Sequence, residues 1–237
     1  MHRNQYDTDV TTWSPDGKLH QVNYAEQSVK QGSCSLGLRS STHAVLAAVR
    51  RSTNALASSQ KKIFKIDDHL GIAISGLTAD ARVLATYMRT ECLNHKYLYN
   101  SPMVTGRLVS DIADKHQSKT QASWKRPYGV GMLIVGLDKD GPHLYQTSPA
   151  GFLHELQAMA IGERSQSAKT YLEGEFATFE NANRGELIMH ALKALKSAAH
   201  DDTPLSSENT SIAIVGVDEP FTVIEGKDVE PLLKQLK

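Results

Sequence analysis

The chain has 237 residues, of which 40% are hydrophobic, so it can bury one sizeable core. Its 26 basic and 26 acidic side chains cancel, which excludes the basic surface typical of nucleic-acid-binding proteins. Two cysteines are too few for a disulfide framework, and no apolar run is long enough to span a membrane. The polar start predicts no secretory signal, so we expect a soluble, intracellular protein without a cofactor.

The N-terminal part combines a polar tail with one short helix. Residues 1–13 are polar, and S-P-D-G at 14–17 predicts a turn. An amphipathic helix is predicted over 18–31, because apolar residues recur there at spacings of three and four. They are Leu19, Val22, Ala25 and Val29. Gly32 then ends the helix, as a glycine in the C′ position often does.

Strands and a long helix follow. Strands are predicted at 33–39, 44–50, 63–66 and 70–75, and the nearly continuous apolar run of the second indicates burial on both faces. A long helical pattern begins at Gly76, with Ser75 or Thr78 as its expected cap. Its predicted apolar stripe consists of Ala79, Val83, Leu84, Tyr87 and Met88.

The second half of the chain repeats this alternation. A second helix is predicted over 103–121, with Leu108, Val109, Ile112 and Ala113 facing inward. A buried strand at 128–137 leads through the turn D-K-D-G into another strand. The remaining predicted elements are helices at 165–179 and 184–199, strands at 210–217 and after 220, and a short C-terminal helix.

This order of elements predicts the fold class. Strands, two helices, strands, two helices and strands bury every apolar face when two sheets pack together and a helix pair covers each outer face. We therefore expect an α+β fold, a four-layer α-β-β-α sandwich of mostly antiparallel strands. The whole chain, 1–237, is predicted to be one domain, with a tail at 1–13, a helix at 18–31 and the sandwich at 32–237.

Four stretches carry a family resemblance. S-P-D-G-K-L-H-Q-V-N-Y-A at 14–25, S-G-L-T-A-D-A-R at 75–82, R-P-Y-G-V-G at 126–131 and A-I-G-E-R-S-Q-S-A-K-T-Y-L-E at 160–173 resemble the α-type subunits of the proteasome. The resemblance implies a sandwich of the N-terminal-nucleophile hydrolase type and a ring of seven related chains. The chain departs from the family pattern at Thr8, His20 and Asn23.

The Gly32–Ser33 junction raises the question of whether this chain is catalytic. A glycine before a serine also occurs where N-terminal-nucleophile hydrolases cleave themselves. The catalytic β subunits of the family use a nucleophile, a lysine, an oxyanion glycine and an aspartate. Alignment with their strands places Ser33 at the nucleophile, Lys62 at the lysine and Gly76 at the glycine. The position of the aspartate falls on Arg50. Because Arg50 replaces the required carboxylate, we expect a non-catalytic subunit whose Gly32–Ser33 junction is a helix end. The alternative is a self-processing serine hydrolase.

Lys62 has a second possible role. The resemblance implies that Lys62, Gly32 and Leu77 line a pocket that binds the C-terminal tails of regulatory-particle ATPases, with the ammonium on the terminal carboxylate. From residue type alone, a solvated end of a strand is the more frequent environment of a lysine.

The resemblance also implies a gate cluster of Tyr6, Asp7, Pro15 and Tyr24, which holds the N-terminal tails away from the pore when an activator docks. The alternative is an aromatic anchor for the N-terminal helix, and both can hold together. The deletion of residues 1–8 alone is expected to leave the pore closed, because this tail is short.

The implied partners are six other α subunits, the β-ring subunits and regulatory particles, in the cytoplasm and nucleus. A free-standing binding module is disfavoured by the large apolar faces of the helices. The ten histidines include no pair at i, i+4, so no metal site is expected.

Overall fold

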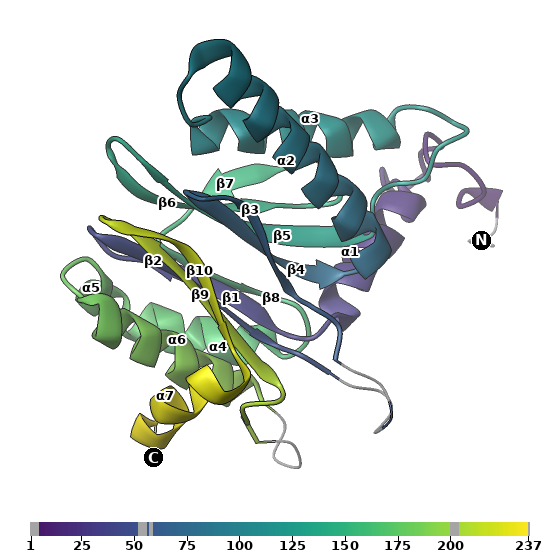
Figure 1. Cartoon of the computed structure of the whole chain (residues 1–237). Helices are drawn as coiled ribbons and strands as arrows, with labels where there is room; N and C mark the ends of the chain where they lie inside the picture. Colours follow the sequence, from purple (N-terminus) through teal and green to yellow (C-terminus); the bar gives the residue numbers. More distant parts are fainter. Residues whose placement is uncertain (1–4, 52–55, 57–58, 200–203, 237) are drawn as a thin grey trace.

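The computed structural model describes residues 5–51, 56, 59–199 and 204–236. Two five-stranded sheets pack face to face, and helices cover both outer faces (Figure 1). The predicted four-layer α-β-β-α sandwich is therefore confirmed.

Each sheet is antiparallel throughout. The first has the order β10-β9-β2-β1-β8, with β1 Ser35–Arg39, β2 His43–Val49, β8 Ala158–Ile161, β9 Thr210–Gly216 and β10 Glu219–Glu225. The second has the order β3-β4-β5-β6-β7, with β3 Ile63–Asp67, β4 Leu70–Gly76, β5 Val130–Asp138, β6 Gly141–Thr147 and β7 Leu153–Glu155. The short strands β7 and β8 were not predicted, because three or four residues carry too little periodicity to be recognised.

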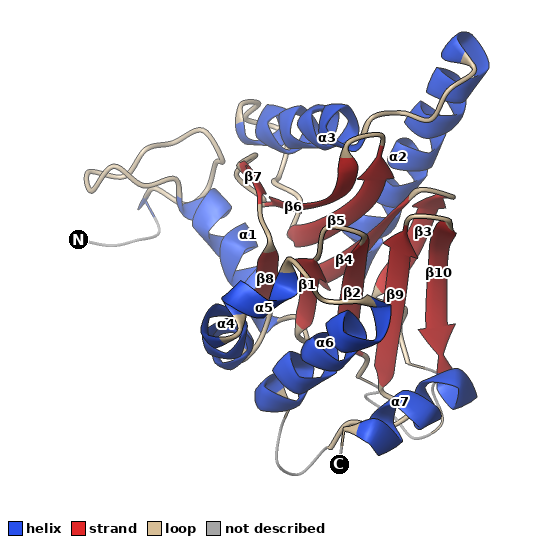
Figure 2. Cartoon of the chain, turned by 90° about the vertical axis from the view of Figure 1, so that its left-hand side faces the viewer, coloured by secondary structure: helices blue, strands red, loops and turns tan. Residues whose placement is uncertain are grey.

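The helices form the outer layers (Figure 2). Over the second sheet lie α2 (Thr78–Tyr99) and α3 (Thr105–Thr120). Over the first sheet lie α4 (Ser165–Gly174), α5 (Phe176–Phe179), α6 (Arg184–Ala198), the 3₁₀ turn η2 (Gly226–Val229) and α7 (Glu230–Gln235). The helix α1 (His20–Gln31) lies at one end of the sandwich. Among the described residues, no helix has the length and apolar character needed to cross a membrane.

Three apolar layers hold the sandwich together. The layer between the sheets is built from the inward-facing residues of β2, β4, β5 and β9, such as Leu46, Ala73, Leu133 and Val215. The alternate residues of the same strands face the helices, which is why these strands are apolar throughout.

The predicted face of the first long helix is partly wrong. Val83 is 55% exposed and Ala79 is also exposed, whereas the buried apolar residues are Ala81, Leu84, Ala85, Met88 and Cys92. The expected cap is wrong as well, since Leu77 precedes α2 and no side chain caps it. With about 3.6 residues per turn, Ala79 and Val83 lie on the opposite side of α2 from Ala81 and Met88, so the predicted stripe combined residues of two faces.

The boundaries of the other helices were better predicted. The inward set of α3, from Leu108 to Ala113, is confirmed. The helix predicted at 165–179 is instead split at Glu175 into α4 and α5. Asn183 and Glu186 form a reciprocal capping box, which explains why α6 begins at Arg184.

Candidate functional site

Four glycines meet where α1 joins the sandwich: Gly32, Gly76, Gly129 and Gly162, which we call the glycine junction. A Cβ on Gly32 would overlap the amide nitrogen of Gly76 and the Ser75 hydroxyl. A Cβ on Gly76 would overlap the carbonyl oxygen of Gly129, and one on Gly162 would lie 2.7 Å from that of Gly32. The backbones of α1, β4 and β5 therefore touch, with no space for a side chain between them.

Two members of the junction are glycine for different reasons. Gly32 ends α1 in an extended conformation, with φ −66° and ψ 149°. The prediction that Gly32 ends α1 is confirmed, but it is the close contact with Gly76, and not a left-handed conformation, that requires glycine there. Gly76 itself has φ +108°, a conformation that L side chains rarely adopt.

Hydrogen bonds fix α1 to the junction. The Ser28 hydroxyl donates to the Gly129 carbonyl at 2.9 Å, and the Leu77 amide donates to the same oxygen at 2.8 Å. The Ser75 hydroxyl, expected from the sequence to cap a helix, donates instead to the Val29 carbonyl at 2.8 Å. The last turn of α1 is thus bonded to both β4 and the segment before β5.

A buried carboxylate supports the junction from the first turn of α2. Asp80 accepts hydrogen bonds from Arg126 Nη1 at 2.7 Å, Arg126 Nη2 at 2.8 Å and the Gly129 amide at 2.9 Å. The Arg126 hydrogen bond is the main cause that lowers the Asp80 pKa. This residue was missed from the sequence, although acidic residues are favoured in the first turn of a helix.

A buried histidine lies beside this ion pair. His116 of α3 is fully buried and packs edge-on against the Tyr128 ring at 5.4 Å. Among the described residues, neither of its ring nitrogens has a hydrogen-bond partner. Burial lowers its pKa to about 4, so the ring is neutral near neutral pH.

Lys62 lies directly before β3, and its carbonyl accepts from the Ile74 amide at 3.0 Å. The residue is only 6% exposed, so the solvated strand end that its residue type favoured is wrong. Burial lowers the pKa of its ammonium to about 8, with a smaller opposing effect of Cys34 and a further lowering by Arg51.

The other two residues predicted for the tail pocket lie on either side of Gly76. Gly32 contacts Gly76 through its backbone, and Leu77 follows Gly76 with its side chain 48% exposed. Since Lys62 pairs with β4 at Ile74, all three predicted residues lie at the same end of that strand.

Arg50, which the alignment places at the catalytic aspartate, directs its guanidinium toward Glu208 and Glu225. Its Nη2 donates to the Glu208 carbonyl at 3.0 Å, and its Nη1 lies 3.6 Å from a Glu225 carboxylate oxygen. The arginine that acts on the Lys62 pKa is Arg51. A second positive charge, that of Arg51, therefore acts on Lys62.

Ser33 is engaged within the fold. Its hydroxyl donates to the Val49 carbonyl at 2.7 Å. The amide of Gly76, at the position of the oxyanion glycine, lies against the backbone of Gly32. The segment that precedes Ser33 therefore occupies the space in front of this amide.

Two of the residues predicted for the gate cluster are in direct contact, and the other two line one groove. The Tyr24 hydroxyl donates to Asp7 Oδ2 at 3.0 Å, and the Gln21 side chain donates to the Asp7 carbonyl. Tyr6 and Pro15 line one groove of about 750 Å³ along α1. The predicted aromatic anchor for the N-terminal helix is thus present as the Tyr24–Asp7 contact.

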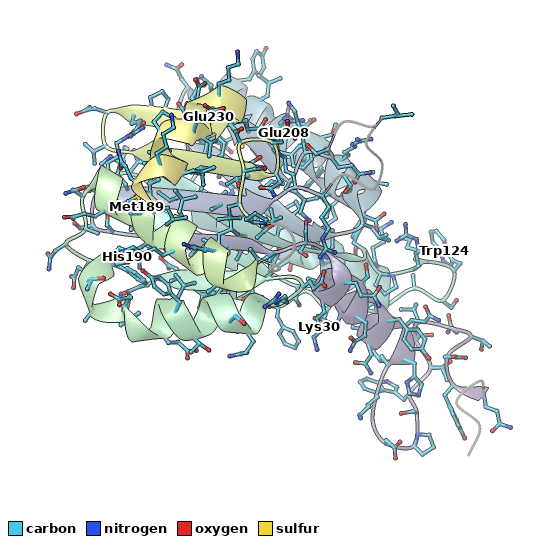
Figure 3. All side chains as sticks on the ribbon, turned by 90° about the horizontal axis from the view of Figure 1, so that it is seen from below. Lys30, Trp124, Met189, His190, Glu208 and Glu230 are labelled. Carbon is cyan, nitrogen blue, oxygen red and sulfur yellow. The ribbon has the colours of Figure 1, made fainter. Side chains whose placement is uncertain are left out.

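The turn that carries Pro15 is built as its sequence predicted. Gly17 has φ +70° and its amide donates to the Ser14 carbonyl at 2.9 Å. In Figure 3 the N-terminal segment and α1, which carries Lys30, project from the sandwich on the same side as Trp124. Residues 1–4 of the tail lie outside the described residues.

Fold and site together define a class: a sandwich of the N-terminal-nucleophile hydrolase type in which a packed helix precedes the nucleophile position. Comparison with known families narrows this class. The family described as "Proteasome subunit" matches residues 29–215, and the N-terminal signature of the A-type proteasome subunits matches residues 6–27. The chain belongs to the proteasome subunit family, and within it to the α-type subunits.

Individual relatives agree with this assignment. The alpha type-1 proteasome subunit of Dictyostelium discoideum is 52% identical over 238 residues, covering 100% of this chain and 96% of the relative. The probable alpha type-6 proteasome subunit of Schizosaccharomyces pombe is 49% identical over 236 residues, covering 100% and 87%. The alpha type-1 proteasome subunit of Drosophila melanogaster is 46% identical over 231 residues, covering 96% and 83%.

Proposed function

We propose that this chain is a non-catalytic subunit of an α ring in the 20S proteasome core, a threonine-type endopeptidase complex. It scaffolds ring assembly, docks regulatory particles and helps to gate the entry of substrates of ubiquitin- and ATP-dependent degradation. Its partners are six other α subunits, the β-ring subunits and the C-terminal tails of regulatory ATPases. It acts in the cytoplasm and the nucleus.

The packing of α1 ahead of Ser33 is the observation that carries this proposal. A segment removed by self-cleavage would not need hydrogen bonds to β4 and to Gly129, yet α1 makes both. A serine within the chain also lacks the free amine that serves as base in an N-terminal nucleophile. The bonded hydroxyl of Ser33 and the covered amide of Gly76 support the same conclusion.

The chemistry of Lys62 supports tail binding. An ammonium with a pKa of about 8 stays mostly protonated at pH 7, and burial strengthens its attraction for a carboxylate. Leu77 offers an exposed apolar side chain nearby, and Gly32 lies beside Gly76 at the same end of β4. We expect the tail carboxylate to enter beside Lys62 after a small opening, since the lysine is buried in the free chain.

The gate proposal is supported by the contacts of the N-terminal segment. Asp7 is held by Tyr24 and Gln21 of α1, while Tyr6 and Pro15 share the groove beside α1. A displacement of the Pro15 turn would therefore be transmitted to the tail.

The mass of the intact chain, purified from its own cells, tests the non-catalytic role. A mass near 26.0 kDa is expected, because the Gly32–Ser33 bond stays uncut. A chain shortened by its first 32 residues would contradict the proposal and indicate the self-processing serine hydrolase.

Lys62→Met tests the pocket, with Lys61→Met as the matched control, because Lys61 is the exposed neighbour. Assembled cores that contain each variant are titrated with an ATPase tail peptide carrying a free or an amidated C-terminus. We expect Lys62→Met to weaken binding of the free-acid peptide about tenfold or more, and Lys61→Met to change it little. Wild-type affinity should fall as the pH rises through about 8, where the ammonium loses its proton. Equal binding by both variants would contradict the pocket without affecting the non-catalytic role.

A further inference from the structure

At the hairpin of β5 and β6, one histidine of β6 lies among three carboxylates. Nε2 of His143 lies 3.2 Å from Asp140 Oδ1 and 3.9 Å from Asp138 Oδ2, and its Nδ1 lies 2.7 Å from Glu155 Oε1. Asp138 ends β5, Asp140 lies in the turn, and Glu155 ends β7. We call His143, Asp138, Asp140 and Glu155 the hairpin cluster. The function proposed for the chain makes no use of it.

The geometry points to a divalent-cation site, of the kind that takes zinc, formed by His143 Nε2, Asp138 Oδ2 and Asp140 Oδ1. These three residues offer one ligand atom each within 4.8 Å of one another. Ligands at the usual zinc bond lengths of about 2.0–2.1 Å lie about 3.3 Å apart in a tetrahedron. The 3.2 Å pair already matches this separation, and the 3.9 Å pair needs a shift of about half an ångström.

The neighbours of the three ligands orient them as the outer partners of a metal site do. Glu155 takes the far nitrogen of His143, an arrangement that fixes the tautomer of a metal-bound imidazole. Asp138 Oδ1 accepts from the Thr105 hydroxyl at 2.9 Å, and Oδ2, which faces His143, accepts from the Thr105 amide at 3.0 Å and keeps a further lone pair for a cation. Arg39 lies 3.8 Å from Glu155 and limits its movement.

Charge and access favour a cation in the same place. Three carboxylates surround one imidazole, so two positive charges added there would be compensated. Asp138 and Asp140 line a cavity of about 660 Å³, from which a water can complete the coordination. On binding, the cation replaces the proton on Nε2, and that proton passes to solvent. Histidine spacing in the sequence gave no sign of such a site, because it contains a single histidine and its other two ligands are the carboxylates of Asp138 and Asp140.

Equilibrium dialysis of the full chain against zinc chloride, with zinc measured by elemental analysis, tests this site. The wild-type chain should bind one zinc ion. Asp140→Asn should weaken binding about tenfold or more, and since Asp140 is 77% exposed this change does not threaten the fold. Glu155→Gln should weaken it by roughly 10–100-fold. His154→Gln, a change of an exposed histidine on β7, is the control and should leave binding unchanged.

X-ray absorption at the zinc edge distinguishes this site from binding at the free thiols of Cys34 and Cys92. Nitrogen and oxygen neighbours at about 2.0–2.1 Å are expected, whereas sulfur at about 2.3 Å would overturn the proposal. The absence of bound zinc, or equal binding by wild type and Asp140→Asn, would also overturn it and leave His143 as a protonated partner of its carboxylates.

Discussion

The glycine junction and the hairpin cluster both join helices to the second sheet, by opposite means. At the junction, the α1 and β4 backbones touch and serine hydroxyls donate to backbone carbonyls. The stability of this region therefore depends on close contact between backbones. At the hairpin cluster, carboxylates of β5 and β7 bind a histidine and the start of α3. The stability of this region therefore depends on charge. Added atoms should therefore disturb the first region most, and altered charge the second.

The largest effect is expected from Gly76→Ala. The new methyl group would overlap the Gly129 carbonyl at a φ of +108°, so unfolding free energy should fall by about 4 kcal/mol or more. Gly17→Ala is the matched control, because Gly17 has φ +70° and nothing within 4 Å of the new atom. It should cost only about 1 kcal/mol in urea denaturation. Equal losses of unfolding free energy in the two variants would show that close backbone contact does not determine the stability of the junction.

The protonation of His116, which lies beside the junction, gives the next largest expected effect on stability. The folded-state pKa of His116 is about 4, below its ordinary 6.5, so the unfolded chain takes up the proton first as the pH falls. Stability should thus be lost between pH 6.5 and 4, by on the order of 3 kcal/mol from this group. In His116→Gln, urea unfolding across this range should show a loss smaller by that amount. An unchanged profile would exclude His116 as the cause.

At the hairpin end, Asp138→Asn should lower the unfolding free energy by about 2 kcal/mol, because Asp138 accepts from the amide and hydroxyl of Thr105 at the start of α3. Asp140→Asn, a few residues away and exposed, should change it by less than about 0.5 kcal/mol. The same urea assay compares the two. If both cost the same, the charge of the cluster as a whole, and not the Thr105 contacts, supports α3.

The smallest effect is expected at Ser33. Ser33→Ala removes one half-buried hydrogen bond to Val49 and should cost about 1 kcal/mol. Peptide hydrolysis by cores that contain this variant should equal that of wild type. A loss of hydrolysis would support the alternative in which Ser33 is a nucleophile.

The sequence was most informative where periodicity is long. The extended apolar runs of β2, β5 and β9 predicted buried strands, and the spacing in α3 predicted its inward face. Periodicity was less reliable at α2, where the predicted apolar stripe combined residues of two faces of the helix. The strands β7 and β8 depend on pairing with β6 and β1, which short segments cannot reveal.

The sequence likewise predicted some features of the candidate site and not others. Leu77 and the turn at Pro15 lie in stretches that resemble the family, whereas Lys62 and Gly32 were predicted from the alignment of the strands with those of the family. The sequence could not foresee that Lys62 is buried, that Arg51 rather than Arg50 acts on it, or that Asp80 and Arg126 pair across 46 positions.

The amino-acid sequence by itself determined the four-layer architecture, the family and the residue types at the candidate site, since these follow from hydrophobic periodicity and from contiguous motifs. Only the tertiary structure decided why Gly32 and Gly76 must be glycine, how deeply Lys62 and His116 are buried, and which carboxylates surround His143. Those properties depend on distances between segments far apart in the chain, and hence on the packing of the two sheets and α1.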